Sequence, residues 1–218
     1  MRMGKCILLT ALVVSCVTSM VCAGAPNRTA DVEQINAMIR RGEWKPVMTK
    51  IRQQPILAQS KDAMGATPLH FAAEQGYVQL GSWLLTVGAK VNSQDYTGQT
   101  PLHRAADTGH FTMCQMLINH GASVRAVDID GLTPLHLASK AKCVKVLADA
   151  GAPVDAQDKL SLTPLFYAVA SARADVVSAL IQANANLNIR DRKGKTALVW
   201  AQERKLTKIA ALLEYAEE

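Results

Sequence analysis

Three histidines recur at a fixed spacing and are the first candidates for chemistry. His70, His103 and His136 lie 33 residues apart, and imidazole nitrogens brought together can hold a zinc ion at about 2 Å. A spacing this regular instead places one histidine in each of several repeated units, in which stacked helices hold equivalent residues about 10 Å apart. That separation is too large for a shared ion. The sequence therefore predicts no metal site and no cofactor.

Two cysteines are the next candidates for chemistry. Of the five cysteines, only Cys114 and Cys143 lie beyond the N-terminal segment described below. Both fall in apolar stretches that are predicted to be helical, which favours two buried free thiols. In an exported protein the pair could instead form a disulfide between neighbouring units, and this alternative stays open.

The sequence contains none of the motifs that usually mark catalysis. It lacks a nucleophile elbow, a Walker loop, a dinucleotide fingerprint and a His-Glu-x-x-His motif. Its 218 residues are 49% hydrophobic, which is too apolar for a disordered chain. Aromatic residues make up only 5%, while Ala and Leu are abundant, which favours helices over a β-sandwich. We therefore predict a helical protein that is not an enzyme.

The N-terminus, residues 1–23, has the pattern of a secretory signal peptide. Arg2 and Lys5 precede a nearly uncharged run over residues 6–21, and this run is shorter than the roughly 20 apolar residues that span a bilayer. Ala23 fits signal peptidase cleavage, followed by a short linker over residues 24–30. The protein is therefore predicted to be exported, either periplasmic or secreted.

A second processing event competes with this cleavage. Residues 13–16 resemble the lipobox of bacterial lipoproteins, so Cys16 is an alternative site of lipid anchoring to the envelope. In either case residues 24–218 carry a net charge of +4 and contain no further run long enough to span a membrane. A weak, dispersed positive charge argues against a nucleic-acid partner.

One four-residue motif recurs through the rest of the chain. Thr-Pro-Leu-His begins at Thr67, Thr100 and Thr133, and degenerate copies begin at Thr163 and Thr196. An Asp stands five residues before each Thr, and a Gly stands two residues before it in four of the five copies. A Thr side chain can cap a helix, and Pro fits the first helical turn, so each motif predicts the start of a helix.

Further glycines predict that each unit holds two helices. Glycine accepts the left-handed backbone at a helix terminus without strain, and Asn is the next best residue there. Gly76 and Gly109 are predicted to separate the first helix from a second helix with an apolar stripe, and the second helix is predicted to end at Gly88, Gly121, Gly151 and Asn184.

These motifs resemble the ankyrin repeat family, whose 33-residue unit contains a Thr-Pro-Leu-His-x-Ala core. The resemblance covers about residues 31–218 and implies an all-α solenoid of stacked helix-turn-helix units with β-hairpin-like loops. It also implies that each motif histidine hydrogen-bonds the neighbouring loop. The expected units, numbered repeats 1 to 6, are a degenerate N-terminal capping repeat at 31–61, repeats at 62–94, 95–127, 128–157 and 158–190, and a C-terminal capping repeat at 191–218.

Repeat 4 is three residues shorter than its neighbours. Residues 139–143 stand where the other repeats have a longer connection between their helices. We expect the turn between the two helices to be pulled in. Because the stability of a solenoid is a sum of repeat and interface terms, we also expect this repeat to be the weakest.

The resemblance implies a protein partner that binds the hairpin tips and the concave helix face, although fold alone does not identify the partner. Successive tips carry apolar residues where solvent would favour polar ones, and contiguous exposed apolar surface marks interaction sites. Tyr96 and Ile129 are the expected anchors, whereas folding against neighbours is an equal alternative for Leu132 and Leu162. The predicted partner-binding residues are Tyr96, Thr97, Gln99, Ile129, Asp130, Leu132, Lys159, Leu160, Leu162, Lys193 and Lys195.

The sequence thus predicts an exported, monomeric protein-protein interaction module that acts as a scaffold or adaptor. Two alternatives belong to other functional classes. One is an inhibitor or immunity-type protein that blocks an enzyme, and the other is a secreted effector that acts in another cell.

Overall fold

The computed structural model describes residues 28–217, so the predicted signal peptide, Cys16 and residues 24–27 of the linker lie outside the described residues. Helices α2 (Arg28–Arg40) and α3 (Trp44–Gln53) and the 3-10 helix η1 (Pro55–Ala58) form the N-terminal unit. Five helix pairs follow: α4 (Pro68–Glu74) with α5 (Val78–Thr86), α6 (Pro101–Thr108) with α7 (Phe111–Asn119), α8 (Pro134–Leu137) with α9 (Ala141–Asp149), α10 (Pro164–Ala170) with α11 (Ala174–Gln182), and α12 (Ala197–Glu203) with α13 (Thr207–Glu217).

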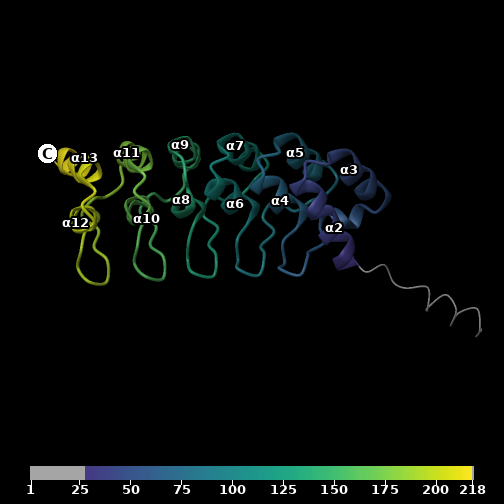
Figure 1. Cartoon of the computed structure of the whole chain (residues 1–218), viewed down its shortest axis with the longest axis horizontal. Coiled ribbons are helices and arrows are strands. Elements are labelled where there is room, and N and C mark those ends of the chain that lie inside the picture. Colours follow the sequence, from purple (N-terminus) through teal and green to yellow (C-terminus); the bar gives the residue numbers. More distant parts are fainter. Residues whose placement is uncertain (1–27, 218) are drawn as a thin grey trace, which may run out of the picture.

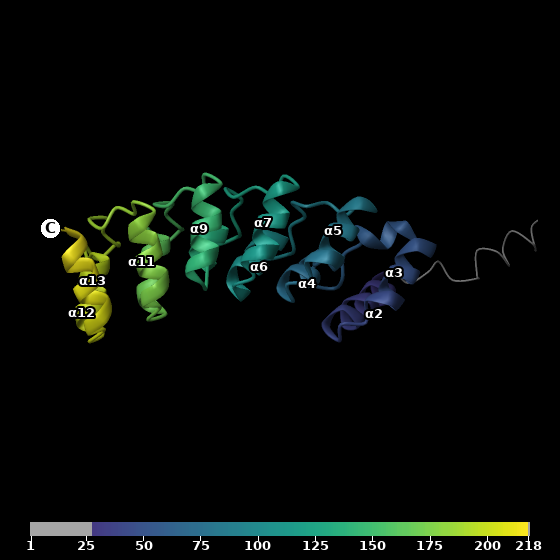
Figure 2. The same cartoon turned by 90° about the horizontal axis from the view of Figure 1, so that it is seen from above.

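The helix pairs stack in a row with two layers. Figure 1 shows α4, α6, α8, α10 and α12 in one layer, the second helix of each pair in the other, and the loops extending beyond the first layer. Seen from above in Figure 2, α5, α7, α9 and α11 lie side by side along the row. This arrangement confirms the predicted all-helical solenoid.

The loops between helix pairs have the hydrogen bonding of tight hairpins. Asp95 N donates to the Gln99 carbonyl at 2.9 Å, and Asp128 N donates to the Leu132 carbonyl at 3.0 Å. No strand is assigned within residues 28–217. The loops are therefore hairpin-like in their hydrogen bonds alone, and we call the five-residue segments that begin at Asp62, Asp95, Asp128, Asp158 and Asp191 the tips.

The first helices begin where the sequence predicts. Thr100 is extended, with φ −97° and ψ 167°, and Pro101 opens α6. The Thr100 N–H donates to His103 Nδ1 at 3.1 Å, which completes a capping box. The same capping box starts α4 and α8. Capping of this kind contributes about 1 kcal/mol to each helix.

Repeats 5 and 6 lack the motif histidine and are joined differently. Phe166 takes the histidine position in α10, and its ring meets Trp200 of α12 edge-on at 5.2 Å between centroids. Arg204 Nη1 also donates to the Ala170 carbonyl at 3.0 Å. Arg192 likewise donates to the Lys159 carbonyl. An aromatic contact and two charged hydrogen bonds therefore link these two units where a histidine links the earlier ones.

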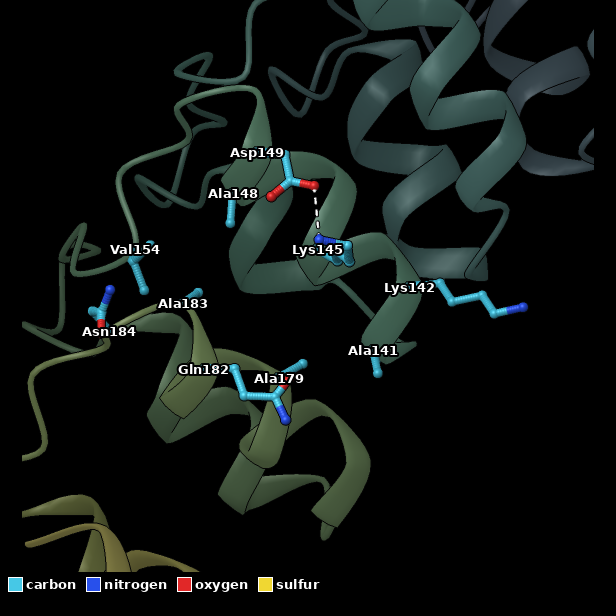
Figure 3. A pocket seen from close by; sticks show the side chains of 10 residues that line it. All are labelled: Ala141, Lys142, Lys145, Ala148, Asp149, Val154, Ala179, Gln182, Ala183 and Asn184. Atoms are coloured by element: carbon cyan, nitrogen blue, oxygen red, sulfur yellow. Dashed lines mark ion pairs between the residues drawn. The ribbon is translucent and has the colours of Figure 1, made fainter.

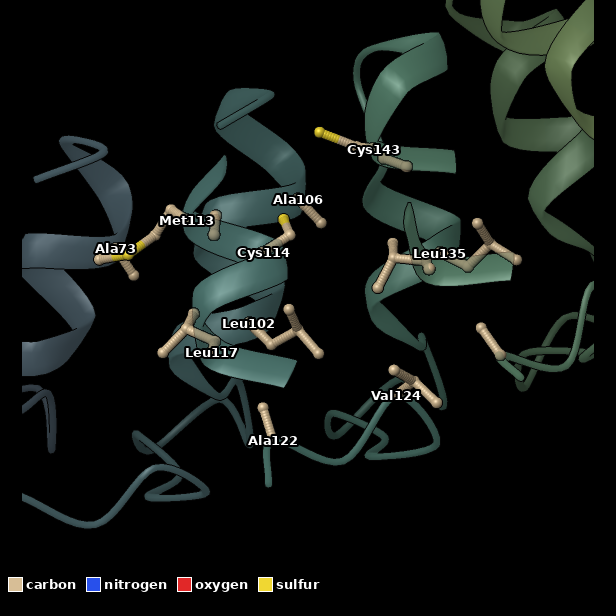
Figure 4. Close-up of a cluster of buried hydrophobic side chains, with 14 of the residues drawn as sticks. Ala73, Leu102, Ala106, Met113, Cys114, Leu117, Ala122, Val124, Leu135 and Cys143 are labelled. Carbon is tan, nitrogen blue, oxygen red and sulfur yellow. The ribbon is translucent and has the colours of Figure 1, made fainter. Parts of the chain in front are cut away.

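The hydrophobic core lies between the two layers and continues from repeat to repeat. Leu102 of α6 is 1% exposed and Leu117 of α7 is fully buried. Figure 4 shows both in one cluster with Leu135 of the next repeat. Burying a leucine side chain contributes about 2 kcal/mol. Since this burial needs a neighbour on each side, no repeat is stable alone.

The N-terminal unit closes one end of this core. The Trp44 ring packs on Tyr77 at 5.1 Å between centroids. Asn36 Nδ2 donates to Asp62 Oδ2 at 3.0 Å. Residues 31–61, predicted as a degenerate repeat, thus form a helix pair that contacts both the first tip and the start of α5.

The deletion in repeat 4 shortens a helix, which corrects the expectation of a pulled-in turn. Helix α8 has four residues, against seven in α4 and α10, while three residues connect it to α9, as in those two pairs. A chain reversal needs these connecting residues, and α9 must stay in line with α7 and α11. The missing residues therefore come from the last turn of α8.

Two repeats use an unfavourable residue at the end of the first helix. Gly109 adopts φ 80° where α6 ends, and the equivalent residue in repeat 5 is Ala172, with φ 53°. Lys205 in repeat 6 likewise has φ 57°. A left-handed backbone costs a residue with a Cβ roughly 1 kcal/mol or more.

We expect Ala172→Gly to raise the free energy of unfolding by about 0.5 to 1 kcal/mol, because glycine removes this strain at an exposed position. Urea unfolding followed by circular dichroism measures the change. The matched control is Ala170→Gly in the last turn of α10, which should lower stability by about 0.5 to 1 kcal/mol since its backbone is helical. Destabilisation by both variants would contradict the left-handed backbone at Ala172.

Candidate functional site

Each tip is shaped by its first aspartate. Asp95 Oδ1 accepts hydrogen bonds from the backbone N–H groups of Thr97 and Gln99 at 2.9 and 3.0 Å. The other four tips have the same pair of bonds, from residues two and four positions after the Asp. The recurring aspartate thus holds all five tips in one conformation.

Neighbouring tips are joined to each other through the backbone. Tyr96 N donates to the Met64 carbonyl at 3.0 Å, and Ile129 N donates to the Thr97 carbonyl at 2.9 Å. Lys159 N continues the series by donating to the Asp130 carbonyl at 3.0 Å. The first four tips therefore form one ordered row.

The motif histidines fasten the tips of repeats 3, 4 and 5 to the first helix of the preceding repeat, as the resemblance implies. His103 Nδ1 faces the Thr100 N–H, and His103 Nε2 lies 3.0 Å from the Leu132 carbonyl. The neutral tautomer with its proton on Nε2 satisfies both contacts. In the same way His70 Nε2 faces the Gln99 carbonyl and His136 Nε2 faces the Leu162 carbonyl, and each Nδ1 accepts from the N–H of its motif Thr.

These histidines are held neutral by the fold. Burial lowers the pKa of His70 to about 4, although its hydrogen bond to the Gln99 carbonyl opposes the shift. Burial lowers the pKa of His103 and His136 in the same direction. Both ring nitrogens of each histidine are occupied by backbone or Thr partners. They therefore act as structural links between repeats.

The predicted anchors lie exposed on successive tips. Tyr96 is 68% exposed, and Ile129 and Leu160 are each 54% exposed. Met64 on the preceding tip is 65% exposed and extends the row. Met64 was not among the predicted binding residues, although the tip position was recognisable from Asp62 two residues earlier. Four neighbouring tips thus each present one large apolar side chain to solvent.

Three other predicted residues take part in the scaffold of the tips. Leu132, Leu162 and Gln99 are half-buried, and their carbonyls accept the histidine hydrogen bonds. Their N–H groups are bound by the tip aspartates. The structure therefore places these residues behind the exposed row, where they support it.

The remaining predicted residues are polar and lie on or beside the row. Thr97, Asp130 and Lys159 are exposed, and the Thr97 hydroxyl donates to Asp95 Oδ1 at 2.6 Å. Lys193 is exposed on the last tip, whereas Lys195 is half-buried and pairs with Glu203. The tips thus combine an apolar row with polar edges.

A second set of side chains connects the first helices to the tips. In three repeats the second oxygen of the tip aspartate accepts a bond from the residue four positions after the motif Thr. These donors differ chemically, and they are Arg104 to Asp95 at 2.8 Å, Tyr167 to Asp158 at 2.7 Å, and Trp200 to Asp191 at 3.0 Å. This contact was not predicted, because the donor type does not repeat.

The two cysteines are buried free thiols, Cys114 on α7 and Cys143 on α9. Figure 4 shows them on neighbouring second helices within the core. A hydrogen bond with the Cys143 thiol, together with burial, raises the pKa of Cys114 above its usual range. A protonated thiol is a poor nucleophile, so Cys114 is held in its less reactive form.

A cavity of about 470 Å³ lies between α9 and α11, in the layer of second helices (Figure 3). Alanines line much of it, and two of its three charged residues, Lys145 and Asp149, pair with each other at 3.1 Å. The third is Lys142, whose ammonium lies 4.9 Å from the centre of the Phe111 ring. Within residues 28–217, no three His, Cys, Asp or Glu side chains are grouped as metal ligands would be. The same part of the chain contains no helix with the length and apolar character of a membrane span.

Comparison with known proteins agrees with this geometry. A family model described as ankyrin repeats, in three copies, matches residues 51–128, 69–158 and 135–218. These overlapping matches together cover well over half of the chain. The comparison with curated proteins returned no match.

Proposed function

Because the chain belongs to the ankyrin repeat family, a general class of protein-protein interaction module, we propose that it is an exported module of this kind that binds one protein partner through its tips and concave helix face. In this role it acts as a scaffold or adaptor, as a monomer and without catalysis. The observation that carries the proposal is the row of exposed apolar side chains on four ordered tips. Leaving Tyr96, Ile129 and Leu160 in water stabilises nothing, whereas a partner that covers them gains hydrophobic free energy.

The binding part of this proposal is tested by capture of the partner after cross-linking in the native source. The double variant Tyr96→Ser with Ile129→Ser should capture at most one tenth of the partner that the parent protein captures. The reason is that central aromatic and aliphatic anchors dominate the binding free energy of an interface. Both residues are exposed, so the fold should be retained.

A matched control removes the same kinds of side chain elsewhere. Tyr215 and Ile56 are 81% and 52% exposed and lie outside the tips. The double variant Tyr215→Ser with Ile56→Ser should capture the partner as the parent does. Equal capture by both double variants, with unchanged circular dichroism, would show that the tips are not the binding surface.

The identity of the captured protein separates the functional alternatives. Loss of an enzyme's activity on titration with the purified protein would favour the inhibitor or immunity-type role. Recovery of the protein from a second cell would favour the effector role. A captured envelope protein whose own activity is unchanged would favour the scaffold.

Export is tested by the mature N-terminus. Signal peptide cleavage after Ala23 predicts a chain that begins at Gly24, whereas lipidation predicts a chain that begins at a modified Cys16. Mass spectrometry of protein from the native source distinguishes the two. An intact N-terminus at Met1 in the cytoplasm would contradict export.

A further inference from the structure

Repeat 3 contains a site in which two carboxylates hold a guanidinium group. Arg104 Nη2 donates to Asp95 Oδ2 at 2.8 Å, and Arg104 Nη1 lies 3.6 Å from Glu74 Oε2. The Asp95 side chain is 2% exposed, whereas the Arg104 and Glu74 side chains are 33% and 30% exposed, so the Asp95 carboxylate is the buried member of this group. The site therefore consists of one carboxylate from the tip of repeat 3, one from the first helix of repeat 2, and the arginine between them.

The two carboxylates recur one repeat further along, but the arginine does not. Asp128 and Asp107 each lie 33 residues after Asp95 and Glu74, and Leu137 stands 33 residues after Arg104. Asp128 Oδ1 accepts the usual two backbone hydrogen bonds at 2.9 Å. Among the hydrogen bonds and ion pairs of residues 28–217, none involves Asp128 Oδ2 or the Asp107 carboxylate.

Asp128 is also deeply placed, since only 9% of the residue is exposed. A carboxylate in such a position has lost part of its hydration without gaining a cation. In repeats 3, 5 and 6 a donor on the first helix meets the equivalent oxygen. In repeat 2 the donor to this oxygen of Asp62 is Asn36 of α2. Repeat 4 is thus the one tip in the described chain whose aspartate lacks this second donor.

A cavity lies beside this gap. Its volume is about 120 Å³, and its walls include Asp107, Leu137, Ala138, Ala168 and Tyr167. The cavity lies between α6 and α10, where the missing last turn of α8 would otherwise stand. It has room for a single side chain. The deletion in repeat 4 therefore opens a pocket at the position where the cation is absent.

We propose that this pocket receives an arginine side chain of the protein partner, whose guanidinium pairs with Asp128 and Asp107 as Arg104 pairs with Asp95 and Glu74. The inference rests on the proposed function, because the arginine comes from the bound partner. The planar guanidinium can donate to two carboxylates at once, whereas an ammonium is a compact point charge. Leu137 and Ala138 provide an apolar wall for the methylene stem.

The neighbouring charges favour a cation in this pocket. Asp158, Asp128 and Asp130 all act on the Tyr167 hydroxyl, whose pKa is raised by burial and by these carboxylates. Tyr167 donates to Asp158, so its oxygen can still accept a bond from a guanidinium. Among the pocket walls Asp107 and Arg173 carry one charge of each sign. Asp128 lies behind these walls and adds a negative charge that acts on Tyr167 and His136.

The pocket is tested first without the partner, by supplying the arginine from the chain itself. Leu137→Arg should form the ion pairs in cis, and Leu137→Met is its neutral control. A double-mutant cycle compares the effect of Asp128→Asn in these two backgrounds. The factor by which Asp128→Asn lowers the folding equilibrium constant should be at least ten times larger in Leu137→Arg than in Leu137→Met. Asn keeps the Oδ1 acceptor that shapes the tip, so the change isolates Oδ2. Equal effects of Asp128→Asn in both backgrounds would overturn the guanidinium site.

A peptide titration gives a second, independent measurement on the whole protein. Acetyl-Ala-Ala-Arg-Ala-Ala-amide should shift the methyl signals of Leu137 in a saturable way, and Asp107→Asn should weaken this binding at least fivefold. The control Asp175→Asn removes the same charge from α11, outside the pocket, and should leave it unchanged. Equal shifts from the peptides with citrulline or lysine in place of arginine, or no saturable shift, would overturn the proposal.

Partner capture then separates this inference from the proposed function. Asp107→Asn with Asp128→Asn should reduce capture by at least fivefold. Unchanged capture by this variant, together with loss of capture by the Tyr96→Ser, Ile129→Ser variant, would reject the arginine site while the interaction module stands. Loss in neither variant would reject the proposed binding surface itself.

Discussion

Lowering the pH from 7 to 5 is expected to reduce the free energy of unfolding by several kcal/mol. The effect comes from His70, His103 and His136, which the fold holds neutral. The pKa of His70 falls from 6.5 to about 4 on folding, and the other two histidines shift in the same direction. Below pH 6.5 the histidines of the unfolded chain therefore bind protons, whereas those of the folded chain stay neutral.

The sign follows from this difference in proton binding. The stabilising contribution is complete above pH 6.5, is lost progressively as the pH falls toward 4, and stops changing below that value. His70 alone contributes about 2 kcal/mol between pH 7 and pH 5 at 1.36 kcal/mol per pKa unit. Protonation of Nδ1 would place a proton against the Thr67 N–H, which lies 3.0 Å away, so the folded state has a direct reason to exclude it.

Urea unfolding at pH 7, 6 and 5 measures this loss. Despite burial, which acts to raise it, hydrogen bonds from Thr97 and Arg104 lower the pKa of Asp95 below 3.8, so this carboxylate contributes only below the chosen range. His70→Gln should reduce the pH dependence by about one third to one half. A free energy of unfolding that is constant from pH 7 to 5 would show that these histidines are not buried as neutral groups.

The parts of the fold that the sequence predicts well are those where one residue type makes one contact in every repeat. Thr100 and His103 illustrate this, because the same pair at 67 and 70 and at 133 and 136 builds the same capping box. The position of a tip follows equally from its aspartate, whose Oδ1 always binds the same two N–H groups. Periodic residues thus identify periodic contacts, and the exposed row of Tyr96 and Ile129 follows from their place on the tips.

Contacts made by different residue types at one position are harder to predict. Arg104, Tyr167 and Trp200 differ in charge and shape and share only a side-chain hydrogen-bond donor, yet each donates to the tip aspartate nine residues earlier. Their common role appears only when the two side chains are seen together. Leu137 stands at the same position in repeat 4 and carries no donor, and it can be recognised as an exception only when that role is known.

The shortened repeat shows a second kind of limit. The sequence locates three missing residues near 139–143, but it does not decide whether the turn or the helix absorbs the loss. The packing of α9 between α7 and α11 decides this, and that packing depends on residues far apart in the chain. Helix α8 therefore loses its last turn, and the pocket beside Leu137 is a consequence of tertiary structure alone.

Replacing Gly98 by alanine should cost about 3 kcal/mol and should disturb the row of tips, whereas the same change at Gly121 should cost about 1 kcal/mol. Both glycines have a left-handed backbone, with φ 78° and 84°, so both substitutions carry the same local strain. They differ in their surroundings. A Cβ on Gly98 would lie 3.0 Å from Asp128 Cα and 3.0 Å from Ile129 N, while a Cβ on Gly121 would meet nothing within 4 Å.

The difference between the two variants therefore measures how closely the tips are packed. Backbone atoms cannot rotate away as a side chain can, so Gly98→Ala must push the tips of repeats 3 and 4 apart and weaken the bond from Ile129 N to the Thr97 carbonyl. Amide exchange at Ile129 should then accelerate in Gly98→Ala and stay unchanged in Gly121→Ala. Equal costs in urea unfolding would mean that the tips move independently. In that case Tyr96 and Ile129 would not be held as one surface, and their joint burial by a rigid partner would lose its physical basis.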